Sequence, residues 1–285
     1  MKKHWRLRFT ALLAAMIALF SGCGEAAIES VAPETTSGTN LTVYCFSAGK
    51  ADAFLLYTEN SAVLIDTGES GFGKTILAYM EAQGIEKLDY LIITHFDKDH
   101  VGGAKKILES IEVGTVLQSN CPKDASAYNK YAAALEALGK QAVTVREDLI
   151  FTLDDVSYTV NPPAQEAYAE DASNNSSLIV SVTNGQNRLL FTGDAEDLRL
   201  TEYLASNPGH YDFLKVPYHG HWLDTLPQLI KAVSPAVAVI TSSEAEPEDE
   251  RTLDMLAQYN AEAYLTRTDP VVVHSDGSAL TVAYE

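Results

Sequence analysis

Apolar residues recur along this chain in short runs that alternate with segments of helical periodicity. Short runs rich in β-branched and aromatic residues predict strands, and an apolar period near 3.6 predicts helices. The predicted strands are 41–46, 53–58, 61–65, 89–94, 114–118, 150–153, 157–160, 178–183, 188–192, 236–241, 262–266 and 270–273. The predicted helices are 72–83, 103–110, 125–138, 195–206, 223–233 and 247–258. Strands mixed with helices over about 245 residues favour one α/β sandwich domain.

The loop after the run that ends at residue 94 carries the densest chemistry in the chain. It holds His95, Asp97, Asp99 and His100 within seven residues. The two carboxylates repel each other unless a cation lies between them, and imidazole with carboxylate is a ligand set that suits divalent metals. The alternative is a solvated polar loop with incidental histidines, because short motifs carry a real false-positive risk.

Three further apolar runs end in a residue capable of the same chemistry. Asp66, Asp194 and His219 each follow such a run. Taken singly, a carboxylate after a strand is most often a helix N-cap or a turn former. A sheet delivers the ends of its strands to one edge, so the three residues and the histidine-rich loop together predict one shared metal site.

These motifs resemble those of the metallo-β-lactamase-fold hydrolases, and within them the branch that contains the hydrolase domain of ComEC-type competence proteins. The motifs that carry the resemblance are Asp97 at the second ligand position of the loop, Asn174-Asn175-Ser176-Ser177, the opening Ser47-Ala-Gly49-Lys50-Ala-Asp52-Ala53, and Lys215 to Gly220. The resemblance covers roughly Leu41 to Glu285. It implies a four-layer αββα sandwich and a metal-dependent hydrolase. The chain departs from the family at Tyr218, where a histidine is usual, and at Glu246-Pro247, where His-Pro is common.

A ligand set follows from this resemblance. It implies that His95 and Asp97 hold one metal, that Asp99, His100 and His219 hold a second, and that Asp194 bridges them. Two cations about 3.5–4 Å apart would acidify a shared water, which then attacks the substrate as hydroxide.

Two aspartates have roles beside the ligand set. Asp99 is the candidate to orient and deprotonate the attacking water. Asp66 is expected to orient the histidine-rich loop through hydrogen bonds, with a plain turn cap as the equal alternative.

The ligand types bear on the choice of metal. Asp97 stands in place of a histidine, and Asn174 or Asn175 offers only an amide oxygen where a further histidine is usual in β-lactamases. Oxygen ligands favour harder cations, so the expected cofactor is a pair of divalent ions, Mn²⁺ or Zn²⁺, with Mg²⁺ as a further candidate.

Other residues have weaker signals. We place Asn174, Asn175 and Tyr218 with Asp99 among the catalytic candidates, Tyr218 as a donor to the leaving group. Lys50, Ser177 and His221 are candidates to bind substrate. The alternatives are a solvated lysine for Lys50 and packing at the rim for His221. These six side chains would complete the site around the metal ligands.

The first 40 residues predict export. Four basic residues precede an apolar stretch too short to span a bilayer comfortably, and small residues then lead to Cys23. This order predicts a lipoprotein signal peptide at 1–22, lipidation of Cys23, a polar linker at 23–40 and a hydrolase domain at 41–285, with a plain secretory signal as the alternative. Removal of 1–22 would change the net charge from −19 to −23.

The expected function is hydrolysis of a phosphodiester in a nucleic acid, a nucleotide or the cell envelope. A metal pair with oxygen ligands suits phosphoryl oxygens. The acidic charge opposes tight binding of long nucleic acids, whose affinity rests on phosphate contacts. The expected partners are therefore a small or polymeric phosphoester and, through the lipid anchor, a membrane. The alternatives are a β-lactam or ester hydrolase and a non-catalytic binding lipoprotein with a decayed site.

Overall fold

The structure, a computed structural model, describes residues 38–285, which form two β-sheets. The strands of the first sheet are β1 (Leu41–Cys45), β2 (Phe54–Tyr57), β3 (Ala62–Ile65), β4 (Lys87–Ile93), β5 (Glu112–Gln118), β6 (Val143–Thr144), β14 (Val271–Ser275) and β15 (Leu280–Tyr284). Those of the second are β7 (Leu149–Leu153), β8 (Val156–Asn161), β9 (Ile179–Asn184), β10 (Asn187–Phe191), β11 (Phe213–Lys215), β12 (Val237–Ile240) and β13 (Glu262–Leu265). Within the described residues, the strand orders are β15-β14-β1-β2-β3-β4-β5-β6 and β13-β12-β11-β10-β9-β8-β7.

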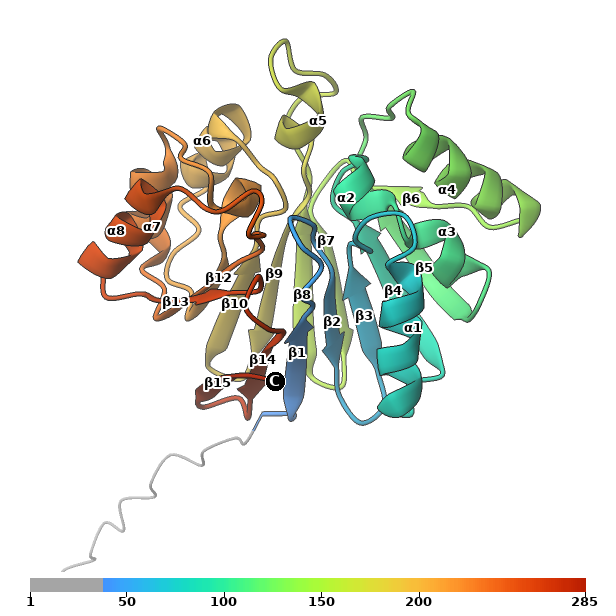
Figure 1. The fold of residues 1–285 in the computed structure, drawn as a ribbon, viewed down its shortest axis with the longest axis horizontal. Coiled ribbons are helices and arrows are strands. Elements are labelled where there is room, and N and C mark those ends of the chain that lie inside the picture. Colours follow the sequence, from blue (N-terminus) through green and yellow to red (C-terminus); the bar gives the residue numbers. More distant parts are fainter. Residues whose placement is uncertain (1–37) are drawn as a thin grey trace, which may run out of the picture. The chain divides into compact units, whose positions relative to one another are not determined.

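Helices cover the outer face of each sheet. The helices are α1 (Gly73–Ala82), α2 (Lys98–Val101), α3 (Ala104–Leu108), α4 (Ser126–Ala137), α5 (Ala172–Asn175), α6 (Asp197–Ala205), the 3₁₀ turn η1 (Pro217–Gly220), α7 (Leu226–Val233) and α8 (Glu250–Gln258). Figure 1 shows the two sheets facing each other, with α1, α3 and α4 outside the first and α6, α7 and α8 outside the second. The predicted four-layer αββα sandwich is therefore confirmed.

Alternation along the strands builds the layers. On β4, Ile92 packs into the core between the sheets, whereas Leu91 and Ile93 pack under the helices. On β10, Phe191 faces the opposite sheet and Leu190 faces the helices. Because successive side chains of a strand point to opposite faces, central strands covered on both sides read as continuous apolar runs.

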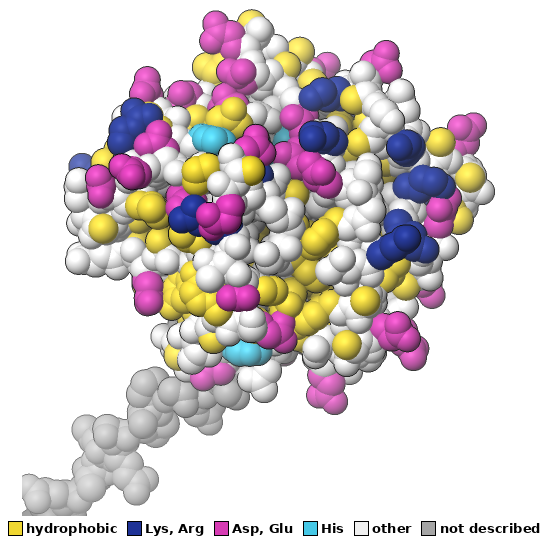
Figure 2. All heavy atoms as spheres, in the orientation of Figure 1, with side chains coloured by type: hydrophobic (Ala, Val, Ile, Leu, Met, Phe, Trp, Pro, Cys, Tyr) yellow, Lys and Arg dark blue, Asp and Glu magenta, His cyan; other side chains and the backbone are white. Residues whose placement is uncertain are grey.

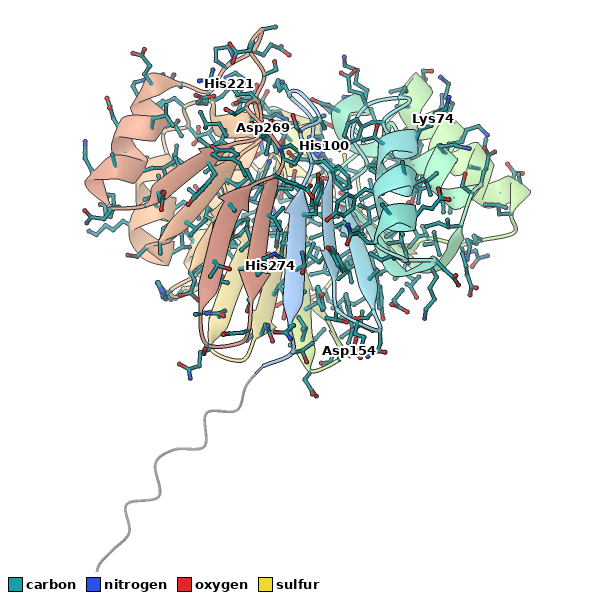
Figure 3. The ribbon with its side chains drawn as sticks, turned by 60° about the horizontal axis from the view of Figure 1, so that its bottom comes forward. Lys74, His100, Asp154, His221, Asp269 and His274 are labelled. Atoms are coloured by element: carbon teal, nitrogen blue, oxygen red, sulfur yellow. The ribbon has the colours of Figure 1, made fainter. Side chains whose placement is uncertain are left out.

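Parallel pairing brings the functional strands to one edge. β3, β4 and β5 run parallel in the first sheet, as do β10, β11, β12 and β13 in the second. Their carboxyl ends deliver Asp66, His95, Asp194 and His219 to the same end of the sandwich. Figure 3 shows His100 at this end and Asp154 at the opposite end.

The structure contains elements that the apolar pattern did not predict. β15 pairs antiparallel with β14, but its residues are half-buried or exposed, so its apolar signal is weak. The four-residue helix α5 lies in a polar stretch, and β6 is only two residues long. The helix predicted at 103–110 is α3, preceded by the short α2, which begins inside the histidine-rich loop. Short or edge elements bury too little apolar surface to mark the sequence.

The N-terminal predictions fall mostly beyond the described part of the chain. The signal peptide at 1–22, Cys23 and all but the last residues of the 23–40 linker lie outside residues 38–285. Within those described residues, no helix has the length and apolar character needed to cross a bilayer.

Candidate metal centre

Asp66 fixes the histidine-rich loop that follows β4. Its Oδ1 accepts the Thr94 N–H at 2.8 Å, and its Oδ2 accepts the Thr94 hydroxyl at 2.6 Å and lies 2.8 Å from His100 Nδ1. The residue is fully buried and has a φ of 57°, a left-handed conformation that costs energy for a non-glycine residue. A histidine that donates from Nδ1 keeps the lone pair of Nε2 for a metal. Asp66 therefore aims His100 Nε2 into the centre.

His219 is aimed by a strained turn at the end of β11. Tyr218 and His219 both have positive φ, at 49° and 52°, and Gly220 follows at 78°. His219 Nδ1 lies 3.0 Å from both the carbonyl oxygen and the hydroxyl of Thr241, which follows β12. Strain of this kind persists only when the surroundings fix it, and it is common at functional sites.

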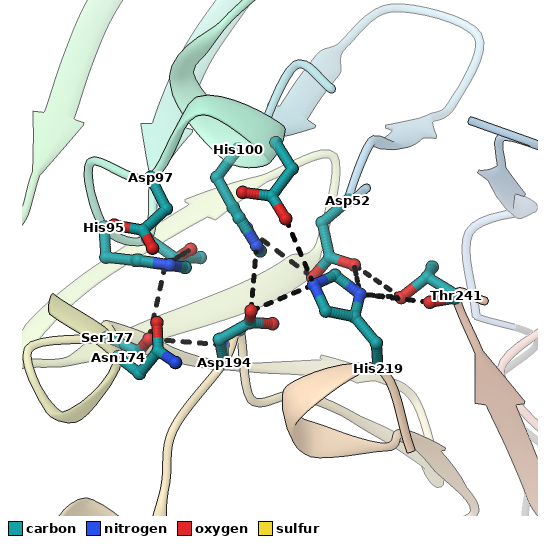
Figure 4. A network of polar contacts seen from close by, with 12 residues as sticks. Asp52, His95, Asp97, His100, Asn174, Ser177, Asp194, His219 and Thr241 are labelled. Atoms are coloured by element: carbon teal, nitrogen blue, oxygen red, sulfur yellow. Dashed lines mark hydrogen bonds and ion pairs between the residues drawn. The ribbon is translucent and has the colours of Figure 1, made fainter. Parts of the chain in front are cut away.

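Figure 4 shows three histidines, His95, His100 and His219, around Asp194. Asp99 lies beside His219. Asp194 Oδ2 lies 3.2 Å from His100 Nε2 and 2.9 Å from His219 Nε2, and Asp99 Oδ2 lies 3.7 Å from His219 Nε2. His95, His100 and Asp194 form one group of possible metal ligands whose donor atoms lie within 4.8 Å of one another, and Asp99, His100 and His219 form another. His100 belongs to both groups, and Asp194 forms a further group with His219 and Asp52.

The buried nitrogens test whether a cation fits. The Nε2 atoms of His95, His100 and His219 are buried, and none makes a hydrogen bond within residues 38–285. The Nε2 atoms of His100 and His219 lie 3.2 and 2.9 Å from Asp194 Oδ2 without the geometry of a hydrogen bond. Buried polar atoms nearly always have a hydrogen-bond partner, so this arrangement needs an explanation. Imidazole nitrogens and carboxylate oxygens form the donor set of a divalent metal, so the residues present fit divalent cations.

The sequence did not reveal the ion pair beneath the centre. Lys215 is fully buried, and its Nζ lies 2.6 Å from Asp52 Oδ2 and 3.4 Å from Asp194 Oδ1. It also donates to the Gly193 carbonyl at 2.8 Å, while the Thr241 hydroxyl donates to Asp52 Oδ1 at 2.6 Å. Lys215 thereby holds Asp194 from behind, on the side away from the histidines. Both residues belong to the stretches of family resemblance, but neither stretch indicates that the two side chains would meet.

Burial and charge set the protonation of the centre. Burial lowers the pKa of His95 to about 4, with a further decrease from the neighbouring His100. Burial opposes the charged form of Asp194, but His219, His100 and Lys215 outweigh it and hold the pKa well below the usual value. Burial likewise opposes the charge of Lys215, yet Asp52 and Asp194 raise its pKa. A neutral His95 and an ionised Asp194 are the forms that bind metal.

Asp97 lies beside His95 but faces other partners. Its Oδ1 lies 2.6 Å from Lys123 Nζ and also accepts the Ser173 hydroxyl. Among residues 38–285, Asp97 belongs to no group of three possible ligands whose donor atoms lie within 4.8 Å of one another. The pairing with Lys123 could not be expected, because that lysine lies on a loop whose conformation the sequence does not reveal.

The two neighbouring asparagines have different surroundings. Asn174 donates to Glu196 Oε1 at 2.6 Å, and its Oδ1 is buried without a hydrogen bond in the described part of the chain. Asn175 accepts the Arg199 N–H at 3.0 Å and donates to the Glu170 carbonyl at 3.2 Å. The amide of Asn175 is therefore occupied in holding α5 to α6, and the carbonyl oxygen of Asn174 is the one left for the site.

Ser177 has no surface on which a substrate could bind. It is fully buried, and its hydroxyl accepts the Asp194 N–H at 3.2 Å and lies 3.4 Å from His95 Nδ1. The turn before Asp194 leaves no room, since a Cβ at Gly193 would lie 3.0 Å from the Thr94 hydroxyl and the φ is 52°. We therefore assign Ser177 a positioning role in place of the substrate contact expected from the sequence.

Lys50, Tyr218 and His221 form a half-exposed rim. Lys50 Nζ lies 5.9 Å from the centre of the Tyr218 ring, and the Tyr218 and His221 rings are 5.0 Å apart. Burial lowers the pKa of His221, with a smaller contribution from Lys50, so a neutral ring is favoured. This rim lies next to His219 in the chain and at the same end of the sandwich as His100 (Figure 3).

Glu196 is a further titratable group near the centre that the sequence did not single out. Burial raises its pKa to about 7, and the nearby Asp171 and Asp194 contribute, although the hydrogen bond from Asn174 lowers it. It precedes α6 and stands two residues after Asp194. A carboxyl that titrates near neutrality beside the centre is a group to include in any account of its chemistry.

Comparison with known proteins agrees with the geometry. Residues 47–242 match the metallo-beta-lactamase superfamily. The chain is 30% identical over 173 residues to ComE operon protein 3 of Bacillus subtilis (strain 168), covering 59% of this chain and 22% of that protein. It is 30% identical over 207 residues to Recombination protein 2 of Haemophilus influenzae, and the match covers 70% of this chain and 24% of that protein. The chain thus spans about a quarter of the length of these curated relatives.

A solved structure supports the fold. The metallo-beta-lactamase fold protein YhfI from Bacillus subtilis superposes with a TM-score of 0.54 at 13% identity, covering 80% of this chain and 96% of that one. These matches confirm the resemblance expected from the histidine-rich loop and the strand-end ligands. This chain belongs to the metallo-beta-lactamase superfamily.

Proposed function

We propose that this protein is a metal-dependent hydrolase of phosphodiesters that uses a pair of divalent cations. The observation that carries the proposal is the convergence on Asp194 of three buried histidine nitrogens that make no hydrogen bond within residues 38–285, with Asp99 beside them. His95 and Asp97 would hold one cation, Asp99, His100 and His219 the other, and Asp194 both. A bound pair would acidify a water and hold the attacking and leaving oxygens of a displacement.

The chain's own groups would orient the reactants. The side chain of Asp99 is the most exposed of the converging ligand candidates, and it can accept the proton of the attacking water. The Tyr218 hydroxyl stands at the rim, where it can donate to the leaving group; burial raises its pKa, so the phenol keeps its proton. Lys50 can hold an anionic substrate oxygen as a compact charge.

Phosphodiesters are favoured by the donor set. Aspartates supply much of the coordination, and oxygen ligands favour hard cations such as Mn²⁺, which suit phosphoryl oxygens. The relative called Recombination protein 2 is consistent with a nucleic-acid substrate. Figure 2 shows acidic side chains over the visible face, and the net charge is −19, so a short oligonucleotide fits better than long duplex DNA.

A substrate panel tests the proposal. The purified chain is loaded with Mn²⁺ or Zn²⁺ and assayed on phosphodiesters, phosphomonoesters, β-lactams and thioesters, with Asp99→Asn as the matched inactive control. We expect slow phosphodiester hydrolysis that is faster with Mn²⁺. Cleavage of only the β-lactam would overturn the phosphodiester assignment. No turnover with both metals bound would favour a binding protein.

We also propose that the protein is exported and held at the membrane by a lipid on Cys23, a residue outside the described part of the chain. The support is the basic, apolar and small-residue order of the first 23 positions. In cells, Cys23→Ser is expected to release the protein or to leave an unprocessed precursor, whereas Cys121→Ser serves as the control. A Cys23→Ser protein that is processed normally and stays at the membrane would show that no lipid anchors it.

A further inference from the structure

Asp97 contacts residues from two separate segments, the loop before α4 and the short helix α5. Lys123, in the loop before α4, lies 2.6 Å from Asp97 Oδ1, and Ser173, in α5, donates to the same oxygen. One carboxylate oxygen is therefore already bonded to an ammonium and a hydroxyl. Only Oδ2 is left to coordinate a cation beside His95.

On the other side of the centre, Asp99 forms no ion pair with a lysine or arginine of residues 38–285. Asp99, His100 and His219 lie in one group of donor atoms within 4.8 Å of one another, and Asp194 lies next to both histidines. Lys215 does reach Asp194, but at 3.4 Å and through Oδ1, whereas the histidines face Oδ2. A cation at this side meets the free oxygen of Asp194.

We propose that Lys123 controls occupancy of the metal position beside His95 and Asp97, so that the protein binds one cation tightly and the second only when Lys123 leaves Asp97. The inference rests on the proposed function, because it concerns the same pair of cations. An ammonium on Asp97 neutralises the carboxylate and repels a divalent ion within a few ångströms. A lysine, a flexible stem with a compact charge, can leave such a partner.

Exposure sets the size of the effect. The Lys123 side chain is 44% exposed and that of Asp97 28%, so solvent screens the pair and the lysine can turn outward. Replacing the Lys123 ammonium with a neutral group is expected to raise the affinity for the second cation by at least about tenfold, a change of about 1.4 kcal/mol in binding free energy. The first cation should be unaffected, since its ligands do not contact Lys123.

The test is calorimetric titration of the metal-free chain with Mn²⁺ and, separately, with Zn²⁺. The wild-type chain is expected to bind one ion tightly and a second more weakly. Lys123→Gln should tighten the second step at least about tenfold and leave the first unchanged. Lys123→Arg, which keeps the charge, should resemble the wild type. Lys130→Gln, an exposed lysine on α4, is the matched control.

Electron paramagnetic resonance gives a second readout that does not depend on activity. Spin-coupled Mn²⁺ pairs should form at a lower metal concentration in Lys123→Gln than in the wild type. Equal second-step affinities in the two proteins, or a change confined to the first step, would overturn the inference and leave the metal pair intact. A wild-type chain that binds no metal would instead overturn the proposed function, and the inference with it.

Discussion

The two sides of the metal centre are built differently. His100 and His219 are each held by a buried acceptor, Asp66 or Thr241, at the end of a central strand. Asp97, on the other side, is held by Lys123, on a loop, and by Ser173, in the four-residue helix α5. Central strands fix an atom's position more firmly than loops do. The comparison teaches that one family motif can supply one preorganised metal position and one whose strength depends on adjustable neighbours.

Left-handed backbone occurs on both sides of the centre, since Asp171, which precedes α5, also has a φ of 42°. The positive φ angles at Asp66, Tyr218 and His219 belong to the segments that aim the firmly held histidines. Lys215 adds a buried ion pair with Asp52 and contacts Asp194 through Oδ1, the oxygen that His100 and His219 do not face. Residues with positive φ and buried ion pairs lower the stability of a fold unless their partners are in place. Their presence indicates that the positions of the ligand side chains are maintained at the expense of stability.

The largest expected effect comes from removing the ligand that the two sides share. Asp194→Ala should reduce metal content to less than one ion per chain and lower turnover by at least ~10³, because both proposed metal positions lose a ligand. Elemental analysis after reconstitution with Mn²⁺ and Zn²⁺ measures the metal content, and a phosphodiester hydrolysis assay measures the turnover. Asp194→Asn, which keeps the shape over Lys215, separates metal loss from unfolding.

An exposed carboxylate provides the control for this experiment. Asp254→Ala, on α8, should keep both metals and full activity. Two ions per chain in Asp194→Ala would show that this residue does not bridge the sides of the centre.

The next effect concerns the base on the firmly held side. Asp99→Asn keeps the shape of the side chain but cannot accept a proton, so turnover should fall by at least ~10². Far-ultraviolet circular dichroism should stay close to the wild type, and turnover is compared at saturating metal because Asp99 is also a proposed ligand. If the variant keeps more than a tenth of the wild-type turnover, the proton goes to another group, and Glu196 becomes the next residue to replace.

The sequence predicts the residues of the firmly held side better than the contacts of Asp97. The apolar runs before Asp66, His95, Asp194 and His219 predict that these residues meet at one edge, and the four-layer fold is confirmed. Buried strands leave a strong apolar signal, so their ends can be located.

The contacts that distinguish the two sides leave no such signal. Lys123 meets Asp97 through a loop, and Asp52 meets Lys215 across the space between the two sheets. No local pattern encodes a pair of side chains that lie far apart in the sequence. The roles expected for Ser177 and Asn175 changed for the same reason, because burial and occupied hydrogen bonds cannot be seen in a short motif.

A smaller effect is expected when Asp66 is replaced, because His100 would then be held less firmly, as Asp97 is. Asp66→Asn removes the charge that faces His100 Nδ1, and outer partners of this kind are typically worth 10–100-fold in metal affinity. We expect the tighter of the two binding steps to weaken by this factor in calorimetry. Ser173→Ala, which acts on the loop-held side, should leave that step unchanged. A tight step that survives Asp66→Asn would show that the loop is fixed by its backbone alone.

The smallest effect is expected at the rim, which belongs to neither side. Lys50 is half-exposed and makes only a distant contact with Tyr218, so its charge should contribute about 0.2–1 kcal/mol to substrate binding, as exposed charges do. Lys50→Gln should therefore raise KM for a phosphodiester up to about fivefold with kcat unchanged. Lys74→Gln, on α1 and well separated from His221 in Figure 3, is the control. The KM difference should shrink as salt is added, because exposed charges are screened. A fall in kcat with unchanged KM would instead place Lys50 in the chemical step, among the groups that act on the reacting phosphate.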